Sequence, residues 1–169
     1  MSDAQRRFTF FWRHQSPFSQ WHSSEFVVKG VRFTCAEQYM MHGKAVLFED
    51  AEMAARILKA KTPKEHKAMG RKVRGFDGAV WERERERIVY AGSHAKFTQN
   101  AELLAALLAT KGTELVEASP TDRIWGVGLS EEDPRIQDPA TWRGQNLLGK
   151  VLTRLREDLL AAGVTQTQP

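Results

Sequence analysis

Cysteine is almost absent from this sequence, since Cys35 is the only one among 169 residues. A single cysteine can form neither an internal disulfide nor a cysteine-rich zinc site, and this usage is typical of a reducing cytosol. Long apolar runs are also missing, because the longest, LLAALLA at 103–109, is far too short to span a membrane. The first residues lack the apolar segment and small-residue cleavage site of a secretion signal. We therefore expect a cytoplasmic protein that does not associate with membranes.

Several catalytic signatures are missing as well. The five histidines have neither H-x-x-x-H nor H-E-x-x-H spacing, so a metal site is not expected. No G-x-S-x-G motif supplies a serine nucleophile. Cys35 has no histidine beside it in the sequence, which favours a buried, inert thiol. We expect an activity that needs neither a metal nor an organic cofactor.

The charge balance is mildly basic. Lys and Arg number 25 against 21 Asp and Glu, which gives a net charge of +4 and a pI near 9.4. The charges alternate along the chain, so they suit an anionic small molecule such as a nucleotide as well as a nucleic acid. In WERERERIVY at 81–90, Glu82 with Arg85 and Glu84 with Arg87 have i,i+3 spacing. This spacing predicts a solvated helical face carrying weak ion pairs.

Hydrophobic periodicity predicts a predominantly helical α+β domain with a small antiparallel sheet. Strands are expected at 8–12 and 113–119, and a hairpin at 25–33 with its turn at Lys29-Gly30. Helices are expected at 34–49 and 50–60, from Thr62 onward, after Asp77-Gly78, between Asn100 and Gly112, and at 145–160. Residues 120–144 predict a long loop of the kind that carries function. We expect one domain over residues 1–162 and a disordered tail over 163–169.

Glu37 and Lys44 form the first candidate site. They are seven residues apart on the predicted first helix, so they share one face and lie roughly 10 Å apart along its axis. Both could line one pocket and contact opposite ends of a ligand. The structural alternative is strong: Thr34-Cys35-Ala36-Glu37 matches a capping box, in which Glu37 would close the helix terminus. Lys44, for its part, could be an ordinary solvated lysine.

The segment TDRIWGVGL at 121–129 is the second candidate site. Asp122 lies three residues before Trp125, and the glycines at 126 and 128 allow close approach of backbone N–H groups to a ligand. This arrangement suits a nucleobase stacked on the indole. The alternative is a loop-anchoring tryptophan with Asp122 as a turn residue. Trp81 is equally open to two interpretations, a core anchor or a wall for ring stacking.

Taken together, the ordered motifs carry a resemblance to a known family. They are SPFSQW, CAEQYMMHGKAVLF, TPKEHKAMGR, W-x-x-x-R, AKFTQN, LVEASPTDRIWGVGL and W-x-G-x-NLLGKVL. This set resembles the NADAR superfamily, also called the YbiA-like or riboflavin-biosynthesis-intermediate N-glycosidase family. The resemblance extends from about Phe10 to Arg156, and it implies a YbiA-like fold and hydrolysis of a ribose–nitrogen bond.

The resemblance also implies substrates and site residues. Substrates in the family are phosphorylated ribosylaminopyrimidines of riboflavin synthesis or, in another branch, ADP-ribosylated guanine and related ADP-ribose compounds. By resemblance, Glu37 becomes the main catalytic candidate, with Asp122 sharing the acid–base work or holding ribose hydroxyls. The resemblance also implies substrate contacts from Lys44, Trp125 and Gly126. The chemistry of the reaction adds Trp81 as a second ring for stacking the base, and Lys44 and Arg71 as candidate contacts to phosphate.

Two other functions compete with this hypothesis. The same pocket could belong to a non-catalytic module that binds NAD or ADP-ribose. The basic pI could instead indicate nucleic-acid binding, which the absence of a basic stripe makes the weakest of the three. The expected partner is thus a small nucleotide-like molecule, either a ribosyl phosphate or ADP-ribose, with ADP-ribosylated nucleic acid as a further option.

Overall fold

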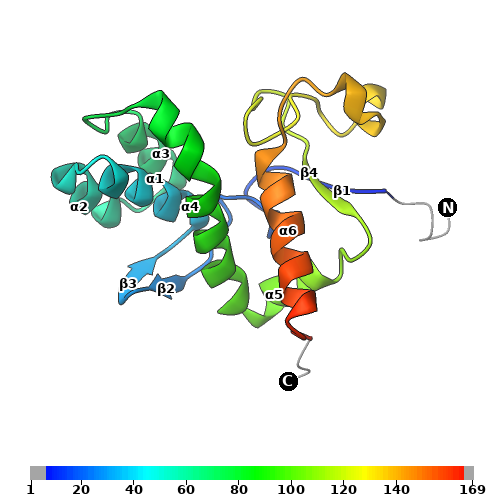
Figure 1. Ribbon diagram of the computed structural model, residues 1–169, viewed down its shortest axis with the longest axis horizontal. Helices are drawn as coiled ribbons and strands as arrows, with labels where there is room; N and C mark the ends of the chain where they lie inside the picture. The colour runs from blue at the N-terminus through cyan, green and yellow to red at the C-terminus, as the bar shows by residue number, and fades with distance from the viewer. Residues whose placement is uncertain (1–6, 166–169) are drawn as a thin grey trace. The chain divides into compact units, whose positions relative to one another are not determined.

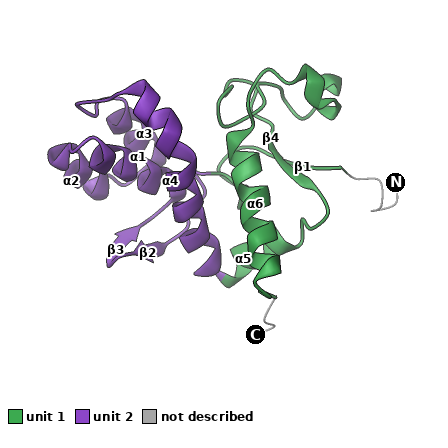
Figure 2. Cartoon of the chain, in the orientation of Figure 1, with its two compact units in different colours: residues 1–19, 101–169 green, residues 20–100 purple. Residues whose placement is uncertain are grey.

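The computed structural model describes residues 7–165, and these form two compact units (Figure 2). Unit 1 combines the chain up to Ser19 with the chain from Ala101 onward, and unit 2 is the intervening segment 20–100. Within residues 7–165 there are six α-helices and two two-stranded sheets, one antiparallel and one parallel (Figure 1). The predicted α+β class, mostly helical with a small antiparallel sheet, is therefore confirmed.

Unit 2 begins with the predicted hairpin. Strand β2 (Phe26–Val28) pairs antiparallel with β3 (Val31–Phe33), and Phe26 lies opposite Phe33. Lys29 and Gly30 between the strands have φ of 51° and 79°, the left-handed conformation that a two-residue hairpin turn needs. The rings of Phe26 and Phe33 stack with centroids 5.6 Å apart, and both belong to one buried cluster with Ala95.

The helices of unit 2 begin where local sequence signals place them. They are α1 (Ala36–Leu47), α2 (Ala51–Lys59), α3 (Pro63–Gly70) and α4 (Gly78–Thr98). Asp50 caps α2 by accepting the Met53 N–H, and Thr62 with Glu65 forms a complete capping box at α3. Asp77 caps α4. These predicted starts are confirmed.

Helix α1 packs against the other three helices of unit 2, and glycines allow the close approach. A Cβ added at Gly92 of α4 would lie 2.4 Å from the Tyr39 ring of α1. A Cβ at Gly70 of α3 would lie on the Met41 sulfur. The backbones of α3 and α4 therefore lie directly against α1.

The capping box predicted for α1 is wrong. The N-cap is Cys35, one residue later than expected, and it makes no side-chain capping bond. The residue that reaches back is Gln38, whose Oε1 accepts the Thr34 N–H at 2.8 Å and the Thr34 hydroxyl at 3.1 Å. Glu37 is the second residue of the helix, and the side chain that bonds to Thr34 is that of Gln38.

Unit 1 is built on a parallel strand pair. Strand β1 (Phe8–Phe11) pairs with β4 (Glu114–Glu117), so that Phe8 lies opposite Glu114. Helix α6 (Leu147–Ala161) packs on β4, and α5 (Ala101–Leu108) packs on α6. The loop after β4 contains two short 3₁₀ helices, η2 (Pro134–Gln137) and η3 (Pro139–Thr141). One buried hydrophobic cluster of unit 1 consists of Phe8, Val116, Ala118, Val127, Leu129 and Ile136.

Polar groups also bond at the ends of two helices. The side-chain amide of Asn100, which precedes α5, donates to the Lys96 carbonyl at the end of α4, 2.8 Å away. Gly163, with φ of 79°, and Val164 donate their N–H groups to the last carbonyls of α6. The first residues of the segment expected to be a disordered tail thus still bond to α6. The last part of that segment, 166–169, lies outside the described residues.

Candidate active site

Unit 2 brings four of the predicted site residues into one electrostatic cluster. Glu37 and Lys44 lie on one face of α1, as the spacing predicted, and the charge of Glu37 is close enough to raise the Lys44 pKa. The Lys44 ammonium lies over the Trp81 ring, 5.6 Å from its centroid, at the first turn of α4. The charge of Arg71, at the end of α3, acts on Lys44 as well. Three helices therefore contribute to this cluster.

Burial dominates the electrostatics of this cluster. Glu37 is buried, with 5% of its surface exposed, and Lys44 is partly buried. Burial lowers the pKa of Lys44, the negative charge of Glu37 opposes that shift, and Arg71 adds to it. Lys44 is therefore not the solvated surface lysine of the alternative interpretation. Its ammonium is easier to deprotonate than an exposed one, which suits a group that exchanges a proton with a substrate.

Two aromatic rings enclose the Lys44 ammonium. Besides Trp81, Phe76 lies 4.6 Å from it, centroid to nitrogen. Phe76 comes from the connection between α3 and α4 and is 51% exposed. Such ring faces stabilise a cation and also offer a stacking surface for a flat ligand. Sequence reasoning missed Phe76, because nothing in the sequence around a single phenylalanine indicates that it lies against the distant Lys44.

The remaining predicted residues belong to unit 1. Asp122 Oδ1 accepts the N–H groups of Ile124 and Trp125 at 2.9 and 2.8 Å, so it forms the turn that sequence analysis offered as an alternative. Its other oxygen makes no hydrogen bond with the part of the chain that the structure describes. Trp125 is partly buried. A Cβ at Gly126 would lie 3.0 Å from the Asp122 and Glu117 carbonyl oxygens, so close packing alone accounts for that glycine.

The expected solvated face of α4 is only partly correct. Arg87 does pair with Glu84, with 2.6 Å between Nε and the carboxylate. Arg85, however, is 9% exposed and its Nε is buried without a hydrogen-bond partner. No described residue forms an ion pair with it, so the predicted Glu82–Arg85 pair is wrong. The i,i+3 spacing was correct for both pairs, but packing of α4 against the rest of unit 2 turned Arg85 inward.

Another buried cation lies further along α4. Lys96, in the AKFTQN motif, is 1% exposed, and burial lowers its pKa to about 7. Cys35 is buried, and burial raises its pKa, so it is a protonated thiol as expected. Its sulfur lies 3.6 Å from His66 Nδ1, a spatial neighbour that the sequence order concealed.

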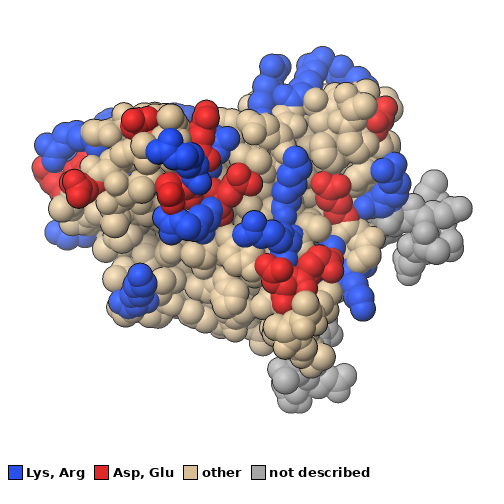
Figure 3. All heavy atoms as spheres, viewed as in Figure 1, with Lys and Arg blue, Asp and Glu red and all other residues tan. Residues whose placement is uncertain are grey.

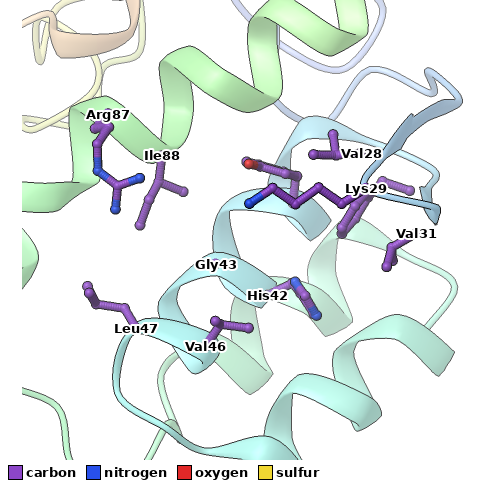
Figure 4. Close-up of a pocket in the computed structure, with 11 residues that line it drawn as sticks. Val28, Lys29, Val31, His42, Gly43, Val46, Leu47, Arg87 and Ile88 are labelled. Carbon is purple, nitrogen blue, oxygen red and sulfur yellow. The ribbon is translucent and has the colours of Figure 1, made fainter.

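A separate pocket of about 400 Å³ lies on the opposite face of α1 (Figure 4). The hairpin, α1 and α4 form its walls, and Figure 4 shows Lys29 and Arg87 reaching toward it from different elements. Its lining residues are Val28, Lys29, Val31, Phe33, Tyr39, His42, Gly43, Val46, Leu47, Arg87 and Ile88. None of the predicted site residues is among them. Burial lowers the pKa of His42, which keeps this mostly apolar pocket free of an imidazolium at neutral pH.

Surface charge gives no sign of a nucleic-acid groove on the face drawn in Figure 3. Basic and acidic side chains lie among one another there, as the alternation in the sequence predicted. Within residues 7–165, no group of three His, Cys, Asp or Glu side chains is placed to hold a metal ion. No helix within these residues is long and apolar enough to cross a membrane.

Comparison with known proteins identifies the class and then the family. The solution structure of YbiA from E. coli superposes with a TM-score of 0.78 at 28% identity, covering 97% of this chain and 91% of that one. The fold is therefore that of YbiA. The family profile of the NADAR domain matches residues 10–160, which span both units. The protein belongs to the NADAR family, as the ordered motifs indicated.

Relatives in sequence agree with this assignment. The N-glycosidase R617 of Acanthamoeba polyphaga mimivirus is 40% identical over 146 residues, covering 83% of this chain and 86% of the relative. Protein irg-1 of Caenorhabditis elegans is 38% identical over 173 residues, covering 93% and 82%. The N-glycosidase YbiA of Escherichia coli K12 is 32% identical over 142 residues, covering 84% and 80%.

Proposed function

We propose that this protein is an N-glycosidase that hydrolyses the bond between a ribosyl carbon and a nitrogen. Relatives that match most of the chain bear the name N-glycosidase, so the protein is a hydrolase acting on N-glycosyl compounds. We further propose that the ribosyl group is phosphorylated, either in an aminopyrimidine intermediate of riboflavin synthesis or in an ADP-ribosylated guanine. The observation that carries the proposal is the buried Glu37 carboxylate beside Lys44 and the Trp81 ring.

Glu37 suits the central step of this reaction. As the C1–N bond lengthens, positive charge develops on C1 and the ring oxygen of ribose. A buried carboxylate stabilises that charge strongly, because a low dielectric weakens it little. Glu37 would also accept a proton from the water that attacks C1, while the electron pair of the broken bond stays on nitrogen. Gln38, and not Glu37, bonds to Thr34 at the helix terminus.

Lys44 and the aromatic rings suit the leaving group. The departing nitrogen needs a proton, and the lowered pKa of Lys44 makes its ammonium a better proton donor than an exposed lysine. Lys44 and Arg71 are also the proposed phosphate contacts. Trp81 and Phe76 provide faces on which the base can stack. Asp122, Trp125 and Gly126 remain proposed substrate contacts on the strength of the family motif, and the second Asp122 oxygen is available for a ribose hydroxyl.

A cytoplasmic location is part of the proposal. It rests on the low cysteine content of the sequence, which has Cys35 alone.

The test is the substitution Glu37→Gln, with Glu82→Gln as the matched control. Both remove one negative charge and keep the size of the side chain, but Glu82 lies on the exposed side of α4. Each variant is incubated with a ribosylaminopyrimidine phosphate and with ADP-ribosylated guanosine, and the released base is measured by mass spectrometry. We expect E37Q to lose turnover by roughly 10²–10⁴-fold and E82Q to keep it.

Binding separates the catalytic hypothesis from the non-catalytic one. Substrate should still raise the melting temperature of E37Q, since the variant keeps the pocket. Near-native turnover by E37Q would show that Glu37 is not the catalytic carboxylate. Intact ligand after long incubation with the wild-type protein, together with clear binding, would identify a binding module instead.

A further inference from the structure

Arg85 differs from the other buried arginine of the described chain. Arg156, 2% exposed, donates to the Thr110 carbonyl and hydroxyl and to the Glu157 carboxylate. Arg85 is also buried, at 9% exposed, yet no described residue accepts a hydrogen bond from it. A guanidinium carries five N–H donors and a permanent charge. Only its Nε is buried without a hydrogen-bond partner, and a buried donor left unpaired costs free energy.

The position of Arg85 on α4 indicates which side of the helix it faces. Trp81, Arg85, Ile88 and Gly92 follow one another at helical i,i+4 and i,i+3 spacing, so they share one face. That face is directed at α1, because Trp81 meets Lys44 and Gly92 meets Tyr39. Arg85 lies one turn, about 5.4 Å, beyond Trp81 along this face. It therefore lies between Trp81, which meets Lys44, and Ile88, which lines the separate pocket.

A buried guanidinium nitrogen without a partner in the protein is suited to an anion. The planar fork of a guanidinium matches two oxygens of a phosphate and forms short, charge-assisted hydrogen bonds with them.

We propose that Arg85 binds the phosphate on the 5′-oxygen of the ribosyl group whose bond to nitrogen is cleaved. The identity of that sugar rests on the proposed function, whereas the anion site itself does not. A phosphate monoester, as in a ribosylaminopyrimidine phosphate, and the diphosphate of ADP-ribose carry this group alike. The W-x-x-x-R motif then has a chemical reason: Trp81 holds the base and Arg85, one turn on, holds the phosphate.

The test compares Arg85→Met with Arg83→Met, which removes the same charge from an exposed position of the same helix. Affinity for ribose 5-phosphate, ADP-ribose and unphosphorylated ribose is measured by calorimetry at constant ionic strength. We expect R85M to weaken binding of a phosphorylated ligand by about 10- to 100-fold, with ribose and R83M unaffected. Loss for ribose 5-phosphate identifies the monoester as the ligand, and loss for ADP-ribose alone identifies the diphosphate.

Stability provides a second, independent readout. Because Arg85 has no partner in the protein, ligand-free R85M should melt at or above the wild-type temperature, which a structural arginine would not allow. Unchanged affinity of R85M for both phosphorylated ligands, equal losses in R83M, or a clearly lower melting temperature of R85M would each overturn the proposal. If R85M does not fold, R85Q is read by the same criteria. These ligands need not be cleaved, so turnover by E37Q and binding by R85M can fail separately.

Discussion

Gln38 and Glu37 are neighbours with opposite predicted roles, and substituting each in turn separates fold from function. Gln38 is 2% exposed and connects two helices. Its Oε1 accepts from Thr34 before α1, and its Nε2 donates to the Ile57 carbonyl at 3.1 Å and the Leu58 carbonyl at 3.4 Å in the last turn of α2. The substitution Gln38→Met keeps the volume and helix propensity but removes all of these bonds.

The expected loss follows from which groups remain unpaired. Thr34 is exposed, so water can replace Gln38 there at little cost. Ile57 is completely buried, and its carbonyl lies in the last turn of α2, where no helical N–H reaches it. One buried carbonyl without a partner costs about 1–3 kcal/mol, and the second lost bond adds about 0.5–1.5 kcal/mol. We expect Q38M to lower the free energy of unfolding by about 2–3 kcal/mol.

The assay is urea unfolding combined with turnover. A loss of this size lowers the melting temperature by roughly 4–12 °C for a chain of this length. Q38M should keep its turnover at a temperature where it remains folded, because Gln38 does not contact the proposed reaction centre. E37Q should show the opposite pattern, with a free energy of unfolding within about 1 kcal/mol of wild type and turnover lowered by roughly 10²–10⁴-fold.

Two results would refute the reasoning. If Q38M unfolds within about 0.5 kcal/mol of the wild type, the hydrogen bonds of Gln38 do not hold α1 to α2. If E37Q is destabilised as much as Q38M, Glu37 has the structural role that the capping-box interpretation assigned to it.

Two further predictions concern packing and pH. Gly92→Ala should lower the free energy of unfolding by about 1–3 kcal/mol, because its methyl group would lie 2.4 Å from the Tyr39 ring. The control Gly78→Ala, in the same helix, should be neutral or stabilising. Equal stability of the two variants would argue against the close contact at Gly92. Asp50 has a pKa lowered from 3.8 to about 2, mainly because Arg74 donates its backbone N–H to it. Its ionised form therefore stabilises the fold fully above pH 3.8, and this contribution disappears as the pH falls through about 2. Unfolding curves of Asp50→Asn should differ from the wild type at neutral pH and converge over that range, and a constant difference would contradict this linkage.

Local sequence signals predicted most element boundaries in unit 2. Asp50 and the Thr62–Glu65 pair act over three or four residues, and the Lys29-Gly30 turn acts over two, so no distant contact is needed to form them. The same short range explains the error at α1. Thr34 and Glu37 satisfy the capping-box pattern, but the helix starts one residue later, where the Glu37 N–H bonds to the Gln20 carbonyl.

The candidate site was predictable to a smaller extent. The Glu37–Lys44 pair follows from helical periodicity alone, and the structure adds that both side chains are removed from bulk solvent. Phe76 and Arg85 could not be found in this way. An i,i+3 rule treats Arg85 and Arg87 alike, although one is buried and unpaired and the other is exposed and paired.

The sequence by itself determined where helices and turns begin, which residues share a helical face, and to which family the ordered motifs belong. Only the tertiary structure decided that β1 pairs in parallel with β4, more than a hundred residues away, and that Arg85 faces inward while Arg87 does not. The physical reason is that capping and periodicity act within a few residues. Strand pairing and desolvation depend instead on which distant surfaces meet, and no local pattern encodes that choice.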